Sequence, residues 1–312
     1  MNVAMTTVAP PEGHHGLGLP DLLAAAAINI VWGLNIVAVK MAVTATGPFT
    51  AAFLRQFVVL LVCLPFLRIM PGRMRALLAV GVVVGAGFLI AINLSVLVSD
   101  NLPALAIAGQ LGVPFALILA IIFLGERIAL PRLLGIAVTF AGVVLLVFDP
   151  AAGRELPGLL LTALGALFWA MASLLQRQLS GVPVLTICAW TGLIGAMILG
   201  PIALFVEPEA VTKLPTLPLR DFSWILLSAI GATVLGQGGM AWLLQRHPIT
   251  SVTPLTLAAP VFSIAASSYF FGTVLTQTMI VGGMIAMTGV AIITMRSARK
   301  FGAQGAAGGG MK

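Results

Sequence analysis

The feature that most constrains this sequence is a succession of continuous apolar runs, each about as long as a membrane span. The runs 76–97 and 102–124, for example, contain no charged residue. A hydrocarbon core of about 30 Å is crossed by about 20 helical residues. Because polar and apolar residues do not alternate within the runs, we expect helices and not the strands of a membrane barrel. The run lengths predict ten spans, approximately 21–42, 47–67, 76–97, 102–124, 131–148, 157–177, 184–206, 222–244, 249–271 and 277–296.

The composition excludes most other classes of protein. Hydrophobic residues make up 60% of the 312 positions and charged residues only 8%, whereas an ordinary soluble domain has about 25% charged residues. A soluble globular enzyme or a disordered chain is therefore not expected. The two cysteines, Cys63 and Cys188, lie inside apolar runs and form no CxxC pattern, so the sequence predicts no metal site and no cofactor. We attribute the net charge of +7 to membrane loops and expect no nucleic-acid partner.

The positive charges predict how the chain crosses the membrane. With both ends inside, only Arg154, Lys213 and Arg220 would face outward, and Lys40 and Arg55 would lie within spans. Basic loops favour the cytoplasmic side, so we predict an N-in, C-in topology with a flexible cytoplasmic tail at 1–20 and a cytoplasmic tail at 297–312. The other basic residues would then all be cytoplasmic: Arg68, Arg73, Arg75, Arg127, Arg132, Arg177, Arg246, Arg296, Arg299, Lys300 and Lys312.

The two halves of the sequence carry the same features in the same order, which indicates an internal duplication. The runs Trp32–Lys40 and Trp169–Arg177 each place a tryptophan eight residues before a cation. Further along, each half has a proline within a span and then a pair of glycines seven residues apart, namely Pro114 with Gly135 and Gly142, and Pro260 with Gly282 and Gly289. The repeats are 21–148 and 157–296. Since five spans is an odd number, the second repeat must be inverted in the membrane, as in many secondary transporters.

These residues resemble a known family. The runs Trp32-Gly-Leu-Asn-Ile-Val-Ala-Val-Lys40, Arg55-Gln-Phe, and Pro114 followed by Leu124-Gly-Glu-Arg127 are similar to the drug/metabolite transporter superfamily, in its ten-span branch with two EamA-type repeats. The resemblance implies export of small metabolites, amino acids among them, across the bacterial inner membrane, and includes a subgroup of aromatic amino acid exporters. The second half departs from the pattern: Phe271-Gly272-Thr273 replaces the Gly-Glu-Arg motif, and the counterpart of Arg55 falls near Trp190.

Polar side chains inside the spans are the candidate substrate contacts, because such groups are costly in lipid. The resemblance implies that the first, third, fourth, sixth, eighth and ninth spans line a central cavity. The alternative for each polar residue is a hydrogen bond or an interface between helices. The candidates for substrate binding are Trp32, Asn35, Lys40, Asn93, Gln110, Trp169, Ser173, Gln237, Trp242 and Thr256.

Two prolines and two cations within spans receive separate interpretations. Pro114 and Pro260 each remove a backbone donor and free a carbonyl four residues earlier, so each is either a hinge at the midplane or a kink that only shapes the bundle. Lys40, near the outer end of its span, could attract a carboxylate. A charge as deep as Arg55 needs a partner, and we expect pairing with Asp100 or with carbonyls at a helix end.

The sequence therefore predicts a transporter of small, partly apolar solutes. Every Asp and Glu falls in a tail, in a loop or at a span end, which favours recognition through aromatic rings, amides and broken helices. Amino acids, especially aromatic or other apolar ones, are the favoured cargo, and nucleobases, vitamins or drug-like solutes are the alternative. An intramembrane enzyme is a remote alternative, because the three histidines lie in a tail or a loop and form no catalytic cluster. We expect a monomer whose partners are a small molecule and membrane lipid.

Overall fold

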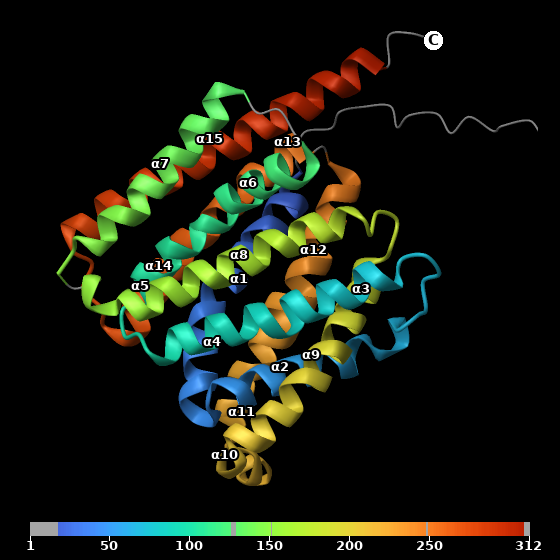
Figure 1. Ribbon diagram of the computed structural model, residues 1–312, viewed down its shortest axis with the longest axis vertical. Coiled ribbons are helices and arrows are strands. Elements are labelled where there is room, and N and C mark those ends of the chain that lie inside the picture. Colours follow the sequence, from blue (N-terminus) through green and yellow to red (C-terminus); the bar gives the residue numbers. More distant parts are fainter. Residues whose placement is uncertain (1–17, 126–128, 151, 248, 309–312) are drawn as a thin grey trace, which may run out of the picture.

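The computed structural model describes residues 18–125, 129–150, 152–247 and 249–308, and within these ranges the chain is helical and has no strand (Figure 1). Most of the predicted N-terminal tail, the last four residues of the C-terminal tail, and Glu126 and Arg127 of the Gly-Glu-Arg motif lie outside the described residues.

The first half contains five apolar segments. The third and fourth are composite: a π-helical segment, Gly81–Phe88, joins α3 to α4, and a short 3-10 segment, Gly109–Leu111, joins α5 to α6. The helices are α1 (Leu19–Thr46), α2 (Pro48–Cys63), α3 (Met74–Val80), α4 (Leu89–Leu97), α5 (Leu102–Ala108), α6 (Gly112–Leu124) and α7 (Leu130–Val147).

The second half repeats this order of elements. A π-helical segment, Leu227–Leu235, joins α11 to α12, and a 3-10 segment, Thr253–Ala258, joins α13 to α14. The short helix α10 (Pro208–Thr212) is an addition in the connection that follows α9. The helices are α8 (Leu156–Arg177), α9 (Val184–Val206), α11 (Leu219–Leu226), α12 (Gly236–Arg246), α13 (Ile249–Val252), α14 (Ala259–Phe271) and α15 (Gln277–Gly308).

Nine helical segments of the described chain are long and apolar enough to cross a membrane, and Leu255–Phe271 is a shorter apolar helix. The segment predicted as the ninth span, 249–271, has the same bounds as α13, the 3-10 segment and α14 taken together. Pro254 lies at the start of its 3-10 segment, Thr253–Ala258, where a proline, which cannot donate an α-helical hydrogen bond, is tolerated. At the other end of the chain, α15 continues beyond the predicted limit of 296 to Gly308, and no proline interrupts it.

The two predicted helix breaks are present. Gln110 lies in one 3-10 segment and Thr256 in the other. Pro114 and Pro260 both fall in the first turn of the helix that follows, where a missing N–H costs little, so each proline marks the start of a new helix and is not a kink in the middle of one. Both of these helices end in the same way, at Gly125 (φ 63°) and Gly272 (φ 64°), a left-handed conformation that glycine adopts without strain.

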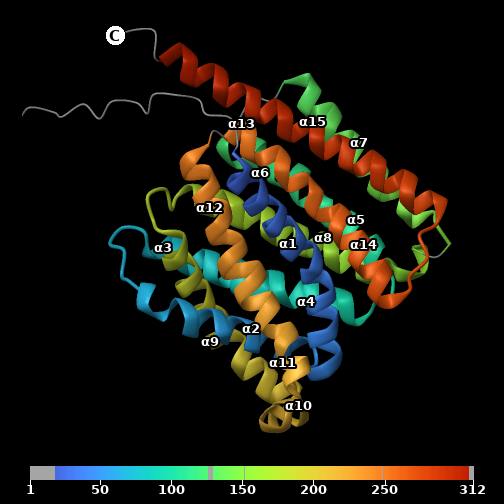
Figure 2. The same cartoon turned by 180° about the vertical axis from the view of Figure 1, so that it is seen from behind.

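The halves pack through reciprocal pairs of helices. The second helix of each half contacts its counterpart, α2 against α9, and the last does so too, α7 against α15. The first helix of each half contacts the fourth segment of the other half, so that α1 packs on α14 and α8 packs on α6. In Figures 1 and 2, α7 and α15 run side by side along one edge of the molecule, apart from the cluster of helices that contains α2 and α9.

Glycines bring α7 and α15 into backbone contact. A Cβ added at Gly142 would lie 2.4 Å from the backbone nitrogen of Ala286, and one added at Gly289 would lie 2.5 Å from that of Thr139. Gly135 and Gly282 are equally confined. Small residues of this kind allow helices to approach closely in lipid, where burial of apolar side chains drives association only weakly. The prediction that these four glycines form a packing face is confirmed.

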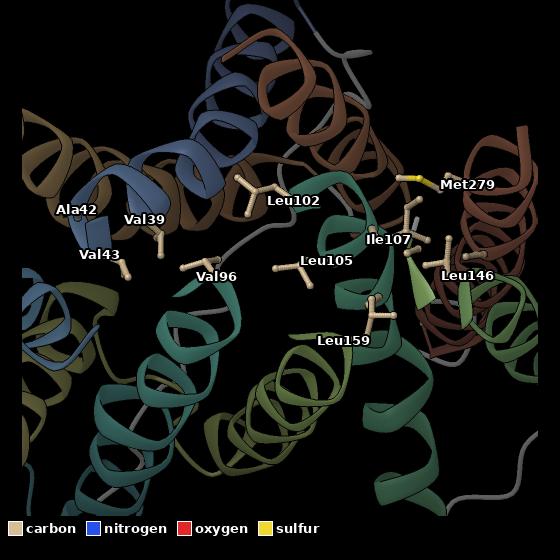
Figure 3. Packing of buried hydrophobic residues seen from close by; sticks show 14 of the residues in the cluster. Val39, Ala42, Val43, Val96, Leu102, Leu105, Ile107, Leu146, Leu159 and Met279 are labelled. Atoms are coloured by element: carbon tan, nitrogen blue, oxygen red, sulfur yellow. The ribbon is translucent and has the colours of Figure 1, made fainter. Parts of the chain in front are cut away.

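One end of the bundle is filled by a cluster of buried hydrophobic residues. Leu102, Leu105 and Ile107 on α5 lie between Val39 and Val96 on one side and Leu146 and Met279 on the other (Figure 3). The cluster thus connects α1 and α4 to the α7–α15 pair by closely packed apolar side chains. A cavity lined by residues of both halves adjoins this cluster.

Candidate functional site

A cavity of about 410 Å³ lies where helices of both halves meet, within the range of about 300–1,000 Å³ that ligand pockets occupy. Segments from both halves contribute to its wall, including both π-helical segments and the 3-10 break before α6. Five of the ten predicted substrate-binding residues line it: Trp32, Asn35, Gln110, Trp169 and Gln237.

The two tryptophans give the cavity its aromatic surface. Trp32 on α1 donates its indole N–H to the carbonyl of Ala232 (3.0 Å) in the π-helical segment Leu227–Leu235, so its ring is fixed across the boundary between the halves. Trp169 on α8 packs its ring against Phe88, with 5.5 Å between the ring centroids, and 39% of its surface is exposed. Aromatic rings in such positions suit cargo with an apolar body.

A chain of hydrogen bonds connects α1, the second π-helical segment and α2 at the cavity wall. Ser228 donates its hydroxyl to Oδ1 of Asn35 (2.7 Å). Thr233 donates to the backbone carbonyl of Ser228 (3.1 Å), five residues earlier, and its hydroxyl oxygen accepts from Nη2 of Arg55 (3.0 Å). The wide turn of the π-helix places Thr233 and Ser228 at this spacing. Asn35, Thr233 and Arg55 all line the cavity.

The structure corrects the expected partner of Arg55. Asp100 pairs with Lys40 (3.3 Å) and is 96% exposed, so it does not reach the guanidinium of Arg55. Within the described part of the chain, no carboxylate pairs with Arg55, and its recorded hydrogen bond is to a side-chain hydroxyl and not to a carbonyl at a helix end. Arg55 is half-buried and faces the cavity.

The structure does not place Lys40 in the cavity. Its ammonium donates to the carbonyls of Val96 and Ser99, each at 2.7 Å. A cation is favourable at this position, because the last carbonyls of a helix such as α4 lack intrahelical partners. These contacts fasten α1 to the end of α4 beside the buried cluster of Figure 3.

The remaining predicted residues also lie off this cavity. Asn93 is buried and donates to the carbonyl of Pro48 (2.8 Å), beside a narrow space of about 10 Å³ that Arg55 also borders. Ser173 donates to the carbonyl of Trp169 (2.9 Å), and the guanidinium of Arg246 lies 3.8 Å from the ring centre of Trp242. Thr256, Pro114 and Pro260 belong to the helix breaks described above and do not line the cavity.

Sequence reasoning missed four polar residues that line the cavity besides Arg55: Gln56, Thr162, Thr191 and Thr233. Gln56 donates to the carbonyls of Gly85 (3.1 Å) and Thr191 (3.3 Å), so it joins α2 to the first π-helical segment and to α9. Arg55 and Gln56 form the most polar pair of neighbours in their span. That pattern could have identified both as residues of the cavity wall. The threonines gave no comparable signal, because a threonine in an apolar helix commonly bonds only its own backbone.

Two smaller cavities of about 200 Å³ each adjoin the central one. The first shares Trp169 and Gln237 with it and continues between Gln176 and Leu244, which are exposed residues at the ends of α8 and α12. The second shares Trp32 and Asn35 and continues toward Val39, Val96 and Leu105, where the buried cluster and the Lys40 contacts close the bundle. The cavity system therefore extends to exposed residues at the Gln176 end and to the buried residues Val39, Val96 and Leu105 at the Lys40 end.

Comparison with known proteins agrees with this architecture. The chain is similar to the "Probable amino-acid metabolite efflux pump" of Escherichia coli (strain K12), with 26% identity over 87% of this chain and 94% of that protein. It is equally similar, at 26% identity over 85% of this chain and 91% of that protein, to a protein of the same description from Salmonella typhimurium. A solved crystal structure has the same fold, with a TM-score of 0.61 at 16% identity over 90% of this chain and 98% of that one.

The model of the EamA-like transporter family matches twice, at residues 19–148 and 156–295. The two matches together cover most of the chain, and every residue that lines the central cavity falls within them. The chain therefore belongs to the EamA-like transporter family, and it is a multi-pass membrane transporter and not an enzyme.

Proposed function

We propose that this protein exports small metabolites across the bacterial inner membrane, with apolar amino acids, aromatic ones included, as the favoured cargo. The observation that carries the proposal is the central cavity of about 410 Å³, which combines two tryptophan rings with the amides of Asn35, Gln110 and Gln237. Such a wall suits a solute with an apolar body and a polar end. The descriptions of the two bacterial relatives support the direction and the cargo.

The proposed mechanism is alternating access between two inverted repeats. The reciprocal pairs α1–α14 and α8–α6, together with α2–α9 and α7–α15, are the contacts expected of halves related by a two-fold axis in the membrane plane. The distribution of basic loop residues supports an orientation with both chain ends in the cytoplasm. In that orientation the cavity reaches exposed residues on the cytoplasmic side, between Gln176 and Leu244, which supports the proposal of an inward-facing state.

The direct test is transport by the purified protein, which we propose acts as a monomer in the lipid bilayer. Liposomes containing the protein would be loaded with a panel of radiolabelled amino acids, and efflux would be compared with that from protein-free liposomes. We expect phenylalanine and leucine to move faster than alanine and lysine. If no amino acid moves while a nucleobase, a vitamin or a drug-like solute does, the amino acid assignment is wrong and the alternative cargo replaces it.

A further inference from the structure

Arg55 is a cation at the wall of the central cavity that the chain itself does not neutralise. It lies midway along α2, half-buried, and within the described residues no carboxylate pairs with it. Asp100, the carboxylate expected to pair with Arg55, pairs with Lys40 instead. A guanidinium carries five N–H donors and stays charged at any physiological pH. Placing such a group within a membrane span costs free energy unless something with negative charge binds it.

The structure holds this guanidinium in a fixed direction. Nη2 donates to the hydroxyl oxygen of Thr233, and that hydroxyl donates in turn to the carbonyl of Ser228. The second π-helical segment thus accounts for one donor of Arg55, while the remaining donors have no partner among the described residues. Because Arg55 lines the cavity of 410 Å³, these donors are available to a molecule inside it.

A second donor group lies on the same network. Oδ1 of Asn35 accepts from the hydroxyl of Ser228, so the two N–H donors of its Nδ2 atom remain for other partners. Asn35 also lines the central cavity. Ser228 and Thr233 are five residues apart on one wide helical turn, so the donors of Asn35 and Arg55 are positioned by the same element. A forked cation beside an amide donor matches the two oxygens of a carboxylate.

We infer that Arg55, assisted by Asn35, binds the carboxylate of the cargo, so that the transported class carries a carboxylate next to an apolar body. The cavity also presents Trp32 and Trp169, which would contact that apolar body. The inference rests on the proposed function and narrows it, because a neutral nucleobase or an amine without a carboxylate would leave Arg55 unpaired. It also assigns carboxylate recognition to Arg55 in the cavity and not to Lys40 at the closed end.

The first experiment needs no mutation. Efflux of labelled phenylalanine from proteoliposomes would be competed with three unlabelled compounds: phenylalanine, phenylalaninamide, which lacks the carboxylate, and 3-phenylpropanoate, which lacks the ammonium. We expect 3-phenylpropanoate to compete and phenylalaninamide to be at least about tenfold weaker than phenylalanine, since a charge-assisted hydrogen bond pair is lost. Equal competition by phenylalanine and its amide would contradict the inference while leaving amino acid transport established.

The second experiment measures binding separately from transport. Thermal unfolding of the purified full-length protein in detergent would be followed with 3-phenylpropanoate or phenylalaninamide, since a ligand that binds the folded state raises the unfolding temperature. We expect stabilisation by 3-phenylpropanoate in the wild type, loss of that stabilisation in Arg55→Gln, and partial retention in Arg55→Lys. Arg220→Gln, which removes the same charge from an exposed position on α11, should behave as the wild type.

The two experiments separate the inference from the function on which it rests. If phenylalanine does not move but 3-phenylpropanoate stabilises the wild type and not Arg55→Gln, the amino acid assignment fails and the carboxylate site stands. If phenylalanine moves but Arg55→Gln keeps the tenfold discrimination against the amide, Arg55 does not read the carboxylate. If 3-phenylpropanoate stabilises neither protein, the site is not a carboxylate site. Thr233→Val, which removes the hydroxyl that orients Arg55, should weaken the discrimination without abolishing it.

Discussion

The indole of Trp32 occupies the space that a side chain at Gly236 would need. A Cβ built at Gly236 would lie 2.3 Å from Nε1 of Trp32, although real contacts of this kind are longer than 3 Å. The same nitrogen donates to the carbonyl of Ala232, one helical turn earlier. The absence of a side chain at one position of α12 therefore fixes the position of an aromatic ring that lines the cavity.

We expect Gly236→Ala to displace Trp32 and to break its hydrogen bond to Ala232. Overpacking at such a site costs about 1–3 kcal/mol of stability. Transport should also fall, because the displaced Trp32 ring would no longer line the cavity in its present position. The control is Gly238→Ala, because a Cβ there would meet nothing within 4 Å. The measurements are the thermal unfolding temperature in detergent and cargo efflux per folded molecule. Equal behaviour of the two variants would show that the ring has room to move.

Two of the three tryptophans predicted from the sequence as substrate contacts, Trp169 and Trp242, should respond differently to substitution. Trp169→Leu removes an indole that lines the cavity, and we expect efflux to fall several-fold at unchanged protein yield. Trp242→Leu removes a ring that lies off the cavity, against Arg246, and we expect efflux close to that of the wild type. If the Trp242 variant loses transport and the Trp169 variant keeps it, the assignment of the cavity as the cargo site is wrong.

Replacing Lys40 with methionine should destabilise the closed end of the bundle. The substitution keeps an unbranched side chain one atom shorter but leaves the carbonyls of Val96 and Ser99 without their donor, a loss of about 1–3 kcal/mol for buried polar groups left unpaired. Asp100→Asn should change the unfolding temperature little, because the carboxylate is 96% exposed and exposed ion pairs contribute at most about 1 kcal/mol. Thermal unfolding of both variants checks this, and a larger loss in the Asp100 variant would contradict it.

The α7–α15 contact should tolerate no added side chain. Gly142→Val places a branched group against the backbone of Ala286, which lies 2.4 Å from the Cβ position, so the two helices must separate. We expect a lower unfolding temperature and a lower yield of folded protein, since close backbone approach is what holds helices together in lipid. Ala141→Val, an increase in size at the neighbouring exposed position, is the matched control, and an equal loss of stability there would point to the helix itself and not to the contact.

Much of the fold could be predicted from the sequence, because lipid leaves few alternatives. A run such as 76–97 has to be helical in a membrane, since the hydrocarbon core offers no other partner for its backbone. The glycines at 135, 142, 282 and 289 also predicted a helix contact, because small residues are what allows two helices to approach closely in lipid. The π-helical segments were not predictable, since Gly81–Phe88 and Leu227–Leu235 read as ordinary apolar helix.

The site was less predictable, because an uncommon polar residue in a span signals a role without saying which role. Lys40 and Asn93 are polar residues within spans as Asn35 and Gln110 are, yet the first two satisfy backbone carbonyls and the last two line the cavity. Which case applies depends on the partner helix opposite each residue, and a single sequence does not contain that pairing. The same uncertainty led to the wrong partner for Arg55.

The π-helical turn of Leu227–Leu235 sets the register of everything that follows it on α12. A π-helix holds more residues in each turn than an α-helix does. If this segment wound as α-helix at the same length, each of its residues would advance the helix by about 100°, more than a π-helical residue does, and Gln237 would rotate around the helix axis. The amide would then leave the cavity wall, although no residue of that wall had been substituted. The composition of the cavity thus depends partly on how the chain winds between α11 and α12, and not only on the identity of its residues.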